Sequence, residues 1–171
     1  NTPTYELEVP STDEKIKYRP FLVKEEKILM IAMESKDNAQ IVNAVKDIVS
    51  ACTFDKIDIS SMPMFDVEYI FLNIRAKSVG EVSKLRVLCP DDKKTYTNVE
   101  VDLTKVNVEI GEGHTNKIEL TDDTGMIMTY PTIDSFTETG ITSINAENMI
   151  ELIGSCGLQI YEDKGEKVYQ G

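Results

Sequence analysis

The chain has 171 residues, of which 41% are hydrophobic, and this is enough to form the core of one ordinary domain or of two small ones. Its 30 acidic residues outnumber 18 basic ones, giving a formal net charge of −12. Because so acidic a surface repels phosphate backbones, nucleic-acid binding is disfavoured, whereas a basic patch on a protein partner would be complementary.

No apolar run approaches the roughly 20 residues that a membrane-spanning helix needs, so no membrane span is expected. The first residues have neither the basic nor the apolar region of a secretory signal peptide. The three cysteines, Cys52, Cys89 and Cys156, lie far apart, which is typical of reduced thiols in a cytoplasm. Cys52 and Cys156 stand beside small or apolar residues and are expected to behave as small hydrophobes.

The first part of the chain predicts two short strands around a turn within residues 5–18, followed by a helix over residues 20–35. The apolar residues of this helix recur at helical spacing and are Leu22, Ile28, Leu29, Ala32 and Met33. Glu25 and Glu26 suit its first turn, because carboxylates interact favourably with a helix N-terminus. We expect this acidic pair to lie on the helix surface rather than to act as a general acid and base.

Two more helices are predicted. Residues 38–50 carry an amphipathic stripe of Ile41, Val42, Val45, Ile48 and Val49. Residues 64–79 follow Pro63, which suits a helix start, and precede Gly80, which suits a helix end. This third helix is apolar over much of its circumference, so it is either deeply buried or docked on a partner.

Beyond residue 80 the pattern changes to period 2, which predicts strands. The predicted strands cover residues 81–89, 95–103, 106–111, 116–121 and 126–131, with turn residues between them. A short final helix is predicted over residues 145–156, with Asn145 as its N-cap and Gly154 near its end.

These elements predict an α+β fold. Its N-terminal half is helical and preceded by short strands, and its C-terminal half consists of antiparallel β-hairpins with a short terminal helix. The mostly helical region spans residues 1–80 and the β-rich region residues 81–171, either as two regions or as one continuous domain.

Cys89, at the tip of a predicted hairpin, raises the possibility of a zinc site. A structural zinc site needs closely spaced pairs of Cys or His ligands. No second cysteine is near Cys89, and the lone histidine, His114, lies 25 positions further on. Because Asp91 and Asp92 are ordinary residues for a solvated turn, we interpret this segment as a polar turn and predict no metal site.

Catalytic motifs are equally weak. The triplet Asp123-Thr124-Gly125 is that of aspartic proteases, but such enzymes need two carboxylates that share a proton, and the triplet occurs once. We interpret residues 122–125 as a hairpin turn. Any Ser-His or Cys-His arrangement must use His114, which lies in a polar, glycine-containing loop. We therefore predict no catalytic residues.

The remaining candidate for function is a surface that binds another protein. Large aromatic residues and arginine are typical of binding hot spots. On the third predicted helix we therefore select a candidate docking face of Phe65, Tyr69, Phe71, Leu72 and Arg75. The alternative is that the same side chains form the core.

Three longer stretches of the sequence are similar to a known family. They are YRPFLVKEEKILMIAMES (residues 18–35), MPMFDVEYIFLNIRAKSVGE (residues 62–81) and LRVLCPDDKKTYTNVEVDL (residues 85–103). Together they resemble the baseplate hub assembly proteins of T4-type contractile-tailed bacteriophages, over about residues 18–169. Relatives can carry paired cysteines in the hairpin after the third helix, like a zinc knuckle, whereas this chain has only Cys89 there.

The resemblance implies a non-enzymatic, chaperone-like protein without a cofactor, made late in infection. It would bind other phage baseplate hub proteins in the host cytoplasm and promote assembly of the tail hub; no oligomeric state is implied. One alternative is a permanent structural subunit of the hub in the virion tail baseplate. An alternative from another class is a hydrolase of the host envelope that uses Asp123 or His114.

Overall fold

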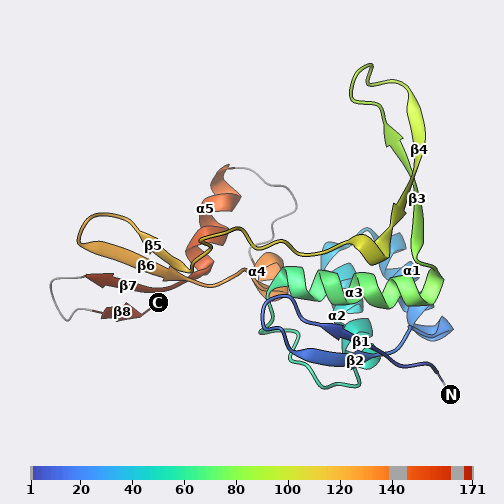
Figure 1. Cartoon of the computed structure of the whole chain (residues 1–171), viewed down its shortest axis with the longest axis horizontal. Helices are drawn as coiled ribbons and strands as arrows, with labels where there is room; N and C mark the ends of the chain where they lie inside the picture. The colour runs from blue at the N-terminus through green and yellow to red at the C-terminus, as the bar shows by residue number, and fades with distance from the viewer. Residues whose placement is uncertain (1, 139–145, 163–167, 171) are drawn as a thin grey trace. The chain divides into compact units, whose positions relative to one another are not determined.

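The computed structural model describes residues 2–138, 146–162 and 168–170 of the chain (Figure 1). Spatial contacts divide the chain into two compact units. Unit 1 consists of Asn1–Asp58 and Phe65–Val108, and unit 2 consists of Ile59–Met64 and Glu109–Gly171. Unit 1 therefore contains the first three helices together with the long hairpin that follows them.

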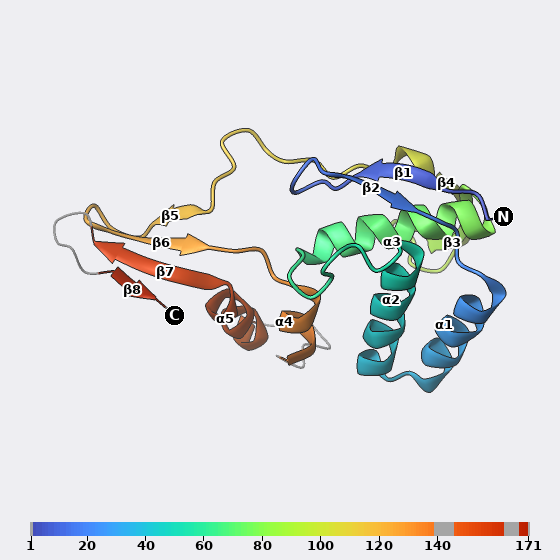
Figure 2. The same ribbon diagram turned by 90° about the horizontal axis from the view of Figure 1, so that it is seen from below.

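Unit 1 begins with an antiparallel hairpin of β1 (Tyr5–Glu8) and β2 (Lys15–Tyr18), followed by the helices α1 (Val23–Ser35), α2 (Asn38–Cys52) and α3 (Met64–Val79). Helices α1 and α2 pack against each other, and Figure 2 shows them side by side. The link between them ends at Asp37, whose carboxylate accepts from the N–H of Ala39 at 3.0 Å and so caps α2.

The core of unit 1 is formed by α2, α3 and the β1–β2 hairpin. Fully or nearly fully buried side chains are Ile48 and Val49 of α2, Val67, Ile70 and Ile74 of α3, and Leu7, Ile16 and Tyr18 of the hairpin. Hydrogen bonds hold the hairpin to both helices: the N–H of Arg19 donates to the carbonyl of Cys52 at 3.0 Å, and that of Ser11 donates to Asp66 at 3.1 Å. Helix α3 is therefore a central element of this unit.

The next element of unit 1 is a long hairpin of β3 (Val82–Leu88) and β4 (Tyr96–Asp102). The strands pair from Val82↔Asp102 to Leu88↔Tyr96 and make their main contacts with each other. In Figure 1 the hairpin projects from the end of α3. The carboxylate of Asp102 then caps the 3₁₀ helix η1 (Leu103–Lys105) by accepting from the N–H of Thr104 at 3.0 Å.

Unit 2 is built on an antiparallel sheet in the order β5-β6-β7-β8. Its strands are β5 (Lys117–Glu119), β6 (Thr124–Met128), β7 (Gly157–Glu162) and β8 (Val168–Gln170), and its helices are α4 (Ile133–Glu138) and α5 (Ala146–Ser155). The segment Ile59–Met64 also belongs to this unit. Its residue Met64 donates its N–H to the carbonyl of Pro131 at 2.9 Å, and the side chain of Ile59 is buried.

The predicted α+β class is confirmed, with helices in the N-terminal half and antiparallel sheets with a short helix in the C-terminal half. Helix α5 lies within the residues predicted for the final helix, and its predicted N-cap, Asn145, lies outside the described residues. Cys52 and Cys156 are buried free cysteines, as expected of small hydrophobes.

Three details of the prediction are wrong. Residues 106–111 alternate as a strand would, but they form no regular structure, and Val106, Val108 and Ile110 are exposed. Thr124 and Gly125, expected in a turn, begin strand β6 instead, because Gly125 pairs with Tyr161 of β7. Helix α4 and strands β7 and β8 were not predicted at all.

Candidate functional site

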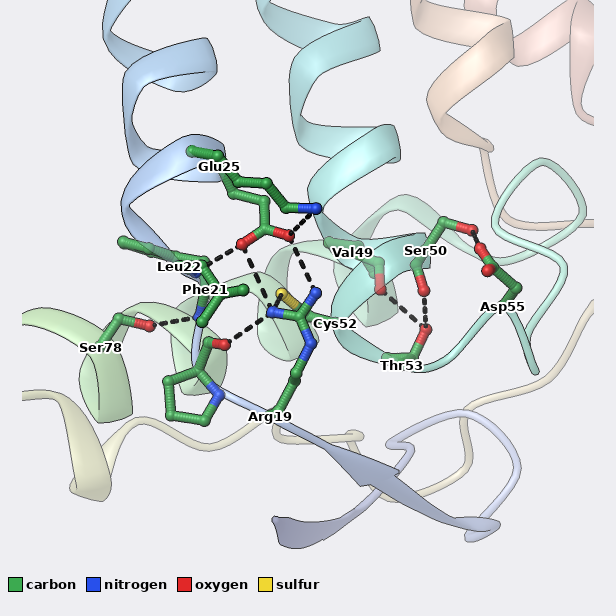
Figure 3. Close-up of polar contacts among 12 residues, drawn as sticks. Arg19, Phe21, Leu22, Glu25, Val49, Ser50, Cys52, Thr53, Asp55 and Ser78 are labelled. Atoms are coloured by element: carbon green, nitrogen blue, oxygen red, sulfur yellow. Dashed lines mark hydrogen bonds and ion pairs between the residues drawn. The ribbon is translucent and has the colours of Figure 1, made fainter. Parts of the chain in front are cut away.

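A buried ion pair joins the end of β2 to the first turn of α1 (Figure 3). Nη2 of Arg19 lies 2.9 Å from Oε1 of Glu25, and Nη1 donates to the carbonyl of Pro20 at 3.0 Å. The N–H of Leu22 donates to the same carboxylate. Glu25 is only 4% exposed. The prediction that it lies on the helix surface is therefore wrong, because Arg19 gives it a buried partner; its neighbour Glu26 is exposed as expected.

The electrostatics of this cluster favour a structural role. Burial raises the pKa of Glu25, but hydrogen bonds from Arg19 and from the N–H of Leu22 outweigh burial and hold the pKa below its ordinary value. Burial also raises the pKa of the Cys52 thiol to about 11, although Nη1 of Arg19 lies 3.6 Å from its sulfur. Such a thiol stays protonated at neutral pH and is a poor nucleophile, so the cluster fixes β2, α1 and α2 together.

A second buried acid, Asp66, lies in the first turn of α3. Its carboxylate accepts from the N–H of Ser11 at 3.1 Å and also from the Ser11 hydroxyl. Burial raises the pKa of Asp66, and the hydrogen bonds from Ser11 partly offset this rise. Because Ser11 lies in the turn between β1 and β2, this contact fixes the small hairpin on α3.

The five residues selected as a docking face are all half-buried on α3; they are Phe65, Tyr69, Phe71, Leu72 and Arg75. The fully buried line of the helix runs instead through Val67, Ile70 and Ile74. The structure therefore places the candidate docking residues beside the core of unit 1, with part of each side chain still accessible.

The tip of the β3–β4 hairpin is a tight polar turn. The N–H of Cys89 donates to the carbonyl of Thr95 at 2.7 Å, and the N–H of Lys93 donates to the carbonyl of Cys89 at 3.0 Å. The carboxylate of Asp92 accepts from the N–H groups of Lys94 and Thr95, each at 2.9 Å, and from the Thr95 hydroxyl. These hydrogen bonds, the Thr95 hydroxyl first, lower the pKa of Asp92 to about 2. The interpretation as a polar turn is confirmed.

The two faces of this hairpin differ in chemistry. Because neighbouring residues of a strand point to opposite faces, one face carries Leu85, Val87, Val99 and Val101 together with Ser83 and Thr97. The other face carries the charged side chains together with Val82 and Leu88. On it Lys84 pairs with Glu100 at 3.3 Å, and the guanidinium of Arg86 lies 4.6 Å from the centre of the Tyr96 ring. Leu85, Val87 and Val99 are exposed, so the described residues of the chain leave the apolar face largely uncovered.

In unit 2, His114 contacts the phenol of Tyr130. Nε2 of His114 lies 2.6 Å from the Tyr130 hydroxyl, and the two rings are stacked with their centres 5.7 Å apart. Both residues line a mainly apolar cavity of about 290 Å³ between the sheet and α5, which Met128 and Leu152 also line. Here histidine has a phenol as its partner, a pair that differs from the acid–histidine pairs of nucleophilic catalysis.

The other candidate for hydrolysis, Asp123, lies in the turn between β5 and β6, where its N–H donates to the Thr121 hydroxyl at 3.4 Å. Among the described residues, no group of three or more His, Cys, Asp and Glu side chains is arranged to hold a metal ion. In the same part of the chain, no helix has the length and apolar character required to cross a membrane.

Comparison with known proteins places these surfaces in context. The sequence model of the family described as T4 bacteriophage base plate protein matches residues 2–171, essentially the whole chain. No curated protein and no solved structure shows a significant match. Unit 1 thus combines a buried polar cluster of Arg19, Glu25 and Cys52 with a β3–β4 hairpin whose apolar face is exposed.

Proposed function

Because the chain belongs to the family of T4 bacteriophage base plate proteins, we propose that it is a non-enzymatic assembly factor of the tail baseplate hub. It binds other hub proteins in the host cytoplasm and, like a chaperone, promotes their assembly without catalysing a reaction. The observation that carries this proposal is the uncovered apolar face of the β3–β4 hairpin.

A partner that covers this face gains free energy from two sources. Fully burying a large aliphatic side chain contributes about 1.5–3 kcal/mol. Leu85, Val87 and Val99 each still expose about two-fifths of their surface or more. In addition, an isolated two-stranded hairpin is at best marginally stable in water, and a third strand or a packed face stabilises it. The hairpin therefore has the character of a binding arm.

The outer edges of the hairpin offer hydrogen bonds as well. The N–H of Cys89 donates to Thr95, and the N–H of Leu103 donates to Glu81, so odd-numbered residues of both strands bond to each other. The N–H and C=O groups of the even-numbered residues consequently point outward, away from the partner strand. A strand of another hub protein can pair with either edge, and its side chains on the apolar side then pack beside those of the hairpin.

The half-buried side chains of α3 remain a second candidate contact. Tyr69→Ala and Leu72→Ala distinguish docking from core packing. If α3 is a docking face, both variants stay folded by circular dichroism and lose affinity for hub proteins. If either variant unfolds the isolated chain, the residue belongs to the core instead.

Affinity capture of the tagged chain from phage-infected cells, with quantification of known baseplate proteins, tests the hairpin. We expect the double variant Leu85→Ser/Val99→Ser to lose most of the hub protein recovered with the wild type. Asn98→Ser, beside Val99 but on the opposite face of the hairpin, is the matched control and should recover the wild-type amount. Equal recovery by the double variant and the control would contradict the proposed role of the hairpin.

The alternative within the family is a permanent structural subunit of the baseplate. Quantitative mass spectrometry of finished particles separates the two roles, because an assembly factor leaves the particle and a subunit remains in it. We expect the protein to be absent from purified virions. A fixed copy number that matches the symmetry of the baseplate would replace the assembly factor by the structural subunit.

The non-enzymatic part of the proposal has its own test. Purified chain is incubated with peptidoglycan and with casein, and the release of soluble fragments is measured. We expect no release above that of a buffer blank. Robust cleavage that disappears in Asp123→Ala or His114→Ala would show a hydrolase.

A further inference from the structure

Helix α1 carries many apolar side chains that the described part of the chain leaves exposed. Its residues Val23, Ile28, Met30, Ile31 and Met33 are all exposed, whereas only Glu25 and Ala32 are buried. A surface helix of a globular protein normally has one apolar stripe that faces the core. Helix α1 is apolar on several sides, so part of its surface is available to another molecule.

Part of this surface forms a groove with the neighbouring helix. A hollow of about 300 Å³ lies between α1 and α2. Ile28, Ile31 and Ala32 line it from α1, and Ala44, Asn43 and Asp47 line it from α2. On each helix the lining residues recur after three or four positions, as from Ile28 to Ile31 and Ala32 and from Asn43 and Ala44 to Asp47, so each set lies along one side of its helix. The groove therefore runs along the two packed helices.

A groove between two packed helices has the shape of the site that a third helix occupies in a helical bundle. Two of the lining side chains, Ala32 and Ala44, are small and buried, which leaves room for larger side chains of an incoming helix. Ile28 and Ile31 supply apolar contact area on one side. An extended strand would leave its backbone hydrogen-bonding groups unpaired here, because helices offer no free edge.

Charge further restricts the occupant. Asp47 lines the groove, is exposed, and forms no ion pair within the part of the chain that the structure describes. With a net charge of −12, two copies of this chain also repel each other. A basic partner gains from both effects, whereas an acidic partner or a second copy does not.

We propose that the groove between α1 and α2 binds an amphipathic helix of another baseplate protein. This helix carries aliphatic residues at helical spacing, which pack on Ile28 and Ile31, and a Lys or Arg beside them that pairs with Asp47. That the partner is a baseplate protein rests on the proposed function. That it is an apolar and basic helix rests on the lining of the groove alone.

Synthetic peptides test the chemistry directly. The probes are an 18-residue amphipathic Leu/Lys peptide, a scrambled peptide of the same composition, and a Leu/Glu counterpart of the first. We expect the Leu/Lys helix to bind the full chain, with NMR shifts confined to α1 and α2, and to bind at least tenfold more tightly than either other peptide. Asp47→Lys should reduce the preference for the Leu/Lys over the Leu/Glu helix, because it removes the local partner of the Lys side chains and leaves the acidic net charge of the chain in place.

A matched pair of variants separates the groove from general stickiness. Ile31 is 66% exposed and lines the groove, and Val23 is 67% exposed on the same helix but does not line it. Ile31→Asp should weaken binding of the Leu/Lys peptide at least tenfold, and Val23→Asp should leave it within twofold. Equal binding by the two variants, or equal binding of the helical and scrambled peptides, overturns the inference. Wild-type dimerisation abolished by Ile31→Asp overturns it too, because the occupant is then a second copy.

The same variants in infected cells separate this inference from the proposed function. Loss of identified baseplate proteins from captured Ile31→Asp, with retention by Val23→Asp, supports both. If Ile31→Asp still recovers them at the wild-type level, the groove inference fails and the proposed function stands. If the wild type recovers none, the proposed function fails, and the peptide measurements alone decide whether the groove binds a basic helix.

Discussion

Helix α3 and the β3–β4 hairpin are neighbours in sequence and in unit 1, and both are rich in apolar residues, yet the fold treats them in opposite ways. Val67, Ile70 and Ile74 of α3 are at most 1% exposed. Leu85, Val87 and Val99 of the hairpin keep about two-fifths or more of their surface in water. The difference shows that an apolar pattern determines which side chains share a face, whereas covering that face depends on what the rest of the chain supplies.

The two regions therefore contribute to different properties, α3 to the stability of the chain and the hairpin to binding. The residues of α3 contribute to the stability of the isolated chain, because they leave water when it folds. Those of the hairpin remain largely in contact with water within the described structure, and they would contribute fully once a partner covers them. Substitutions of the fully buried residues of α3, Val67, Ile70 and Ile74, should therefore change the free energy of unfolding, and substitutions on the apolar face of the hairpin should change binding.

Ile70→Ala is the change with the largest expected effect. Ile70 is fully buried in α3, so truncation removes buried apolar contact and leaves a cavity. We expect the free energy of unfolding, measured by urea denaturation, to fall by about 2–5 kcal/mol. A fall of less than about 1 kcal/mol would show that α3 is not the centre of the core and would remove the contrast with the hairpin.

Glu25→Gln should have the next largest effect. It leaves Arg19 partly buried without its counter-ion, so we expect a loss of about 3 kcal/mol in urea denaturation at pH 7. The exposed neighbour is the control: Glu26→Gln should change the free energy of unfolding by less than about 0.5 kcal/mol.

The stabilising effect of Glu25 should depend on pH. The pKa of Glu25 is lower in the folded chain than its ordinary value of 4.5. Its contribution is therefore fully present above that ordinary value and is lost as the pH falls through the lower, folded-state pKa. The difference in unfolding free energy between wild type and Glu25→Gln should narrow below pH 4.5. A constant difference down to acid pH would contradict the ion-pair account.

Gly125→Ala tests a glycine that lies against another side chain, and Gly111→Ala tests one in open space. A Cβ at Gly125 would lie 2.1 Å from the hydroxyl oxygen of Tyr161, so the Tyr161 ring must turn away and leave the Lys117 ammonium, now 4.5 Å from its centre. We expect a loss of about 1–3 kcal/mol and a changed near-ultraviolet tyrosine signal. Gly111→Ala, where no atom lies within 4 Å, should be close to neutral. Equal effects would mean that Tyr161 does not lie over Gly125.

Leu85→Ser should have the smallest effect on stability, despite the size of the lost side chain. Leu85 is already exposed, so we expect the global free energy of unfolding to change by less than about 0.5 kcal/mol. Hydrogen exchange of the hairpin amides should accelerate, because the isolated hairpin is marginally stable. A global loss as large as that of Ile70→Ala would show that the chain itself covers the hairpin.

The sequence predicts the three helices and the first long hairpin well. The second helix and the hairpin have a clear period, and the third helix lies between Pro63 and Gly80, which suit its start and end. Strands β7 and β8 were missed, although Leu158 and Ile160 alternate as strand residues do. Residues 106–111 show the opposite error, since alternation without a neighbouring strand does not produce one. Pairing with a distant strand is a tertiary property that a local pattern cannot contain.

The exposure of the candidate surfaces is likewise a tertiary property that the local pattern does not contain. The helical spacing of Leu22, Ile28 and Met33 suggests a buried face for α1, yet all three are exposed. The burial of Glu25 depends on Arg19, six positions earlier, and on the approach of α2, which no local pattern reveals. The apolar face of the hairpin was visible as alternation in the sequence, and its lack of cover became visible only in the fold.

The three cysteines provide a practical means of observing the hairpin. Cys52 and Cys156 are buried, whereas Cys89 is partly accessible beside the hairpin tip. A maleimide fluorophore should therefore label the native chain mainly at Cys89, without any engineered substitution. A fluorophore on Cys89 thus reports from the proposed binding arm. A change in its emission should show that a partner has bound to the hairpin, and labelling of Cys52 should show that unit 1 has unfolded.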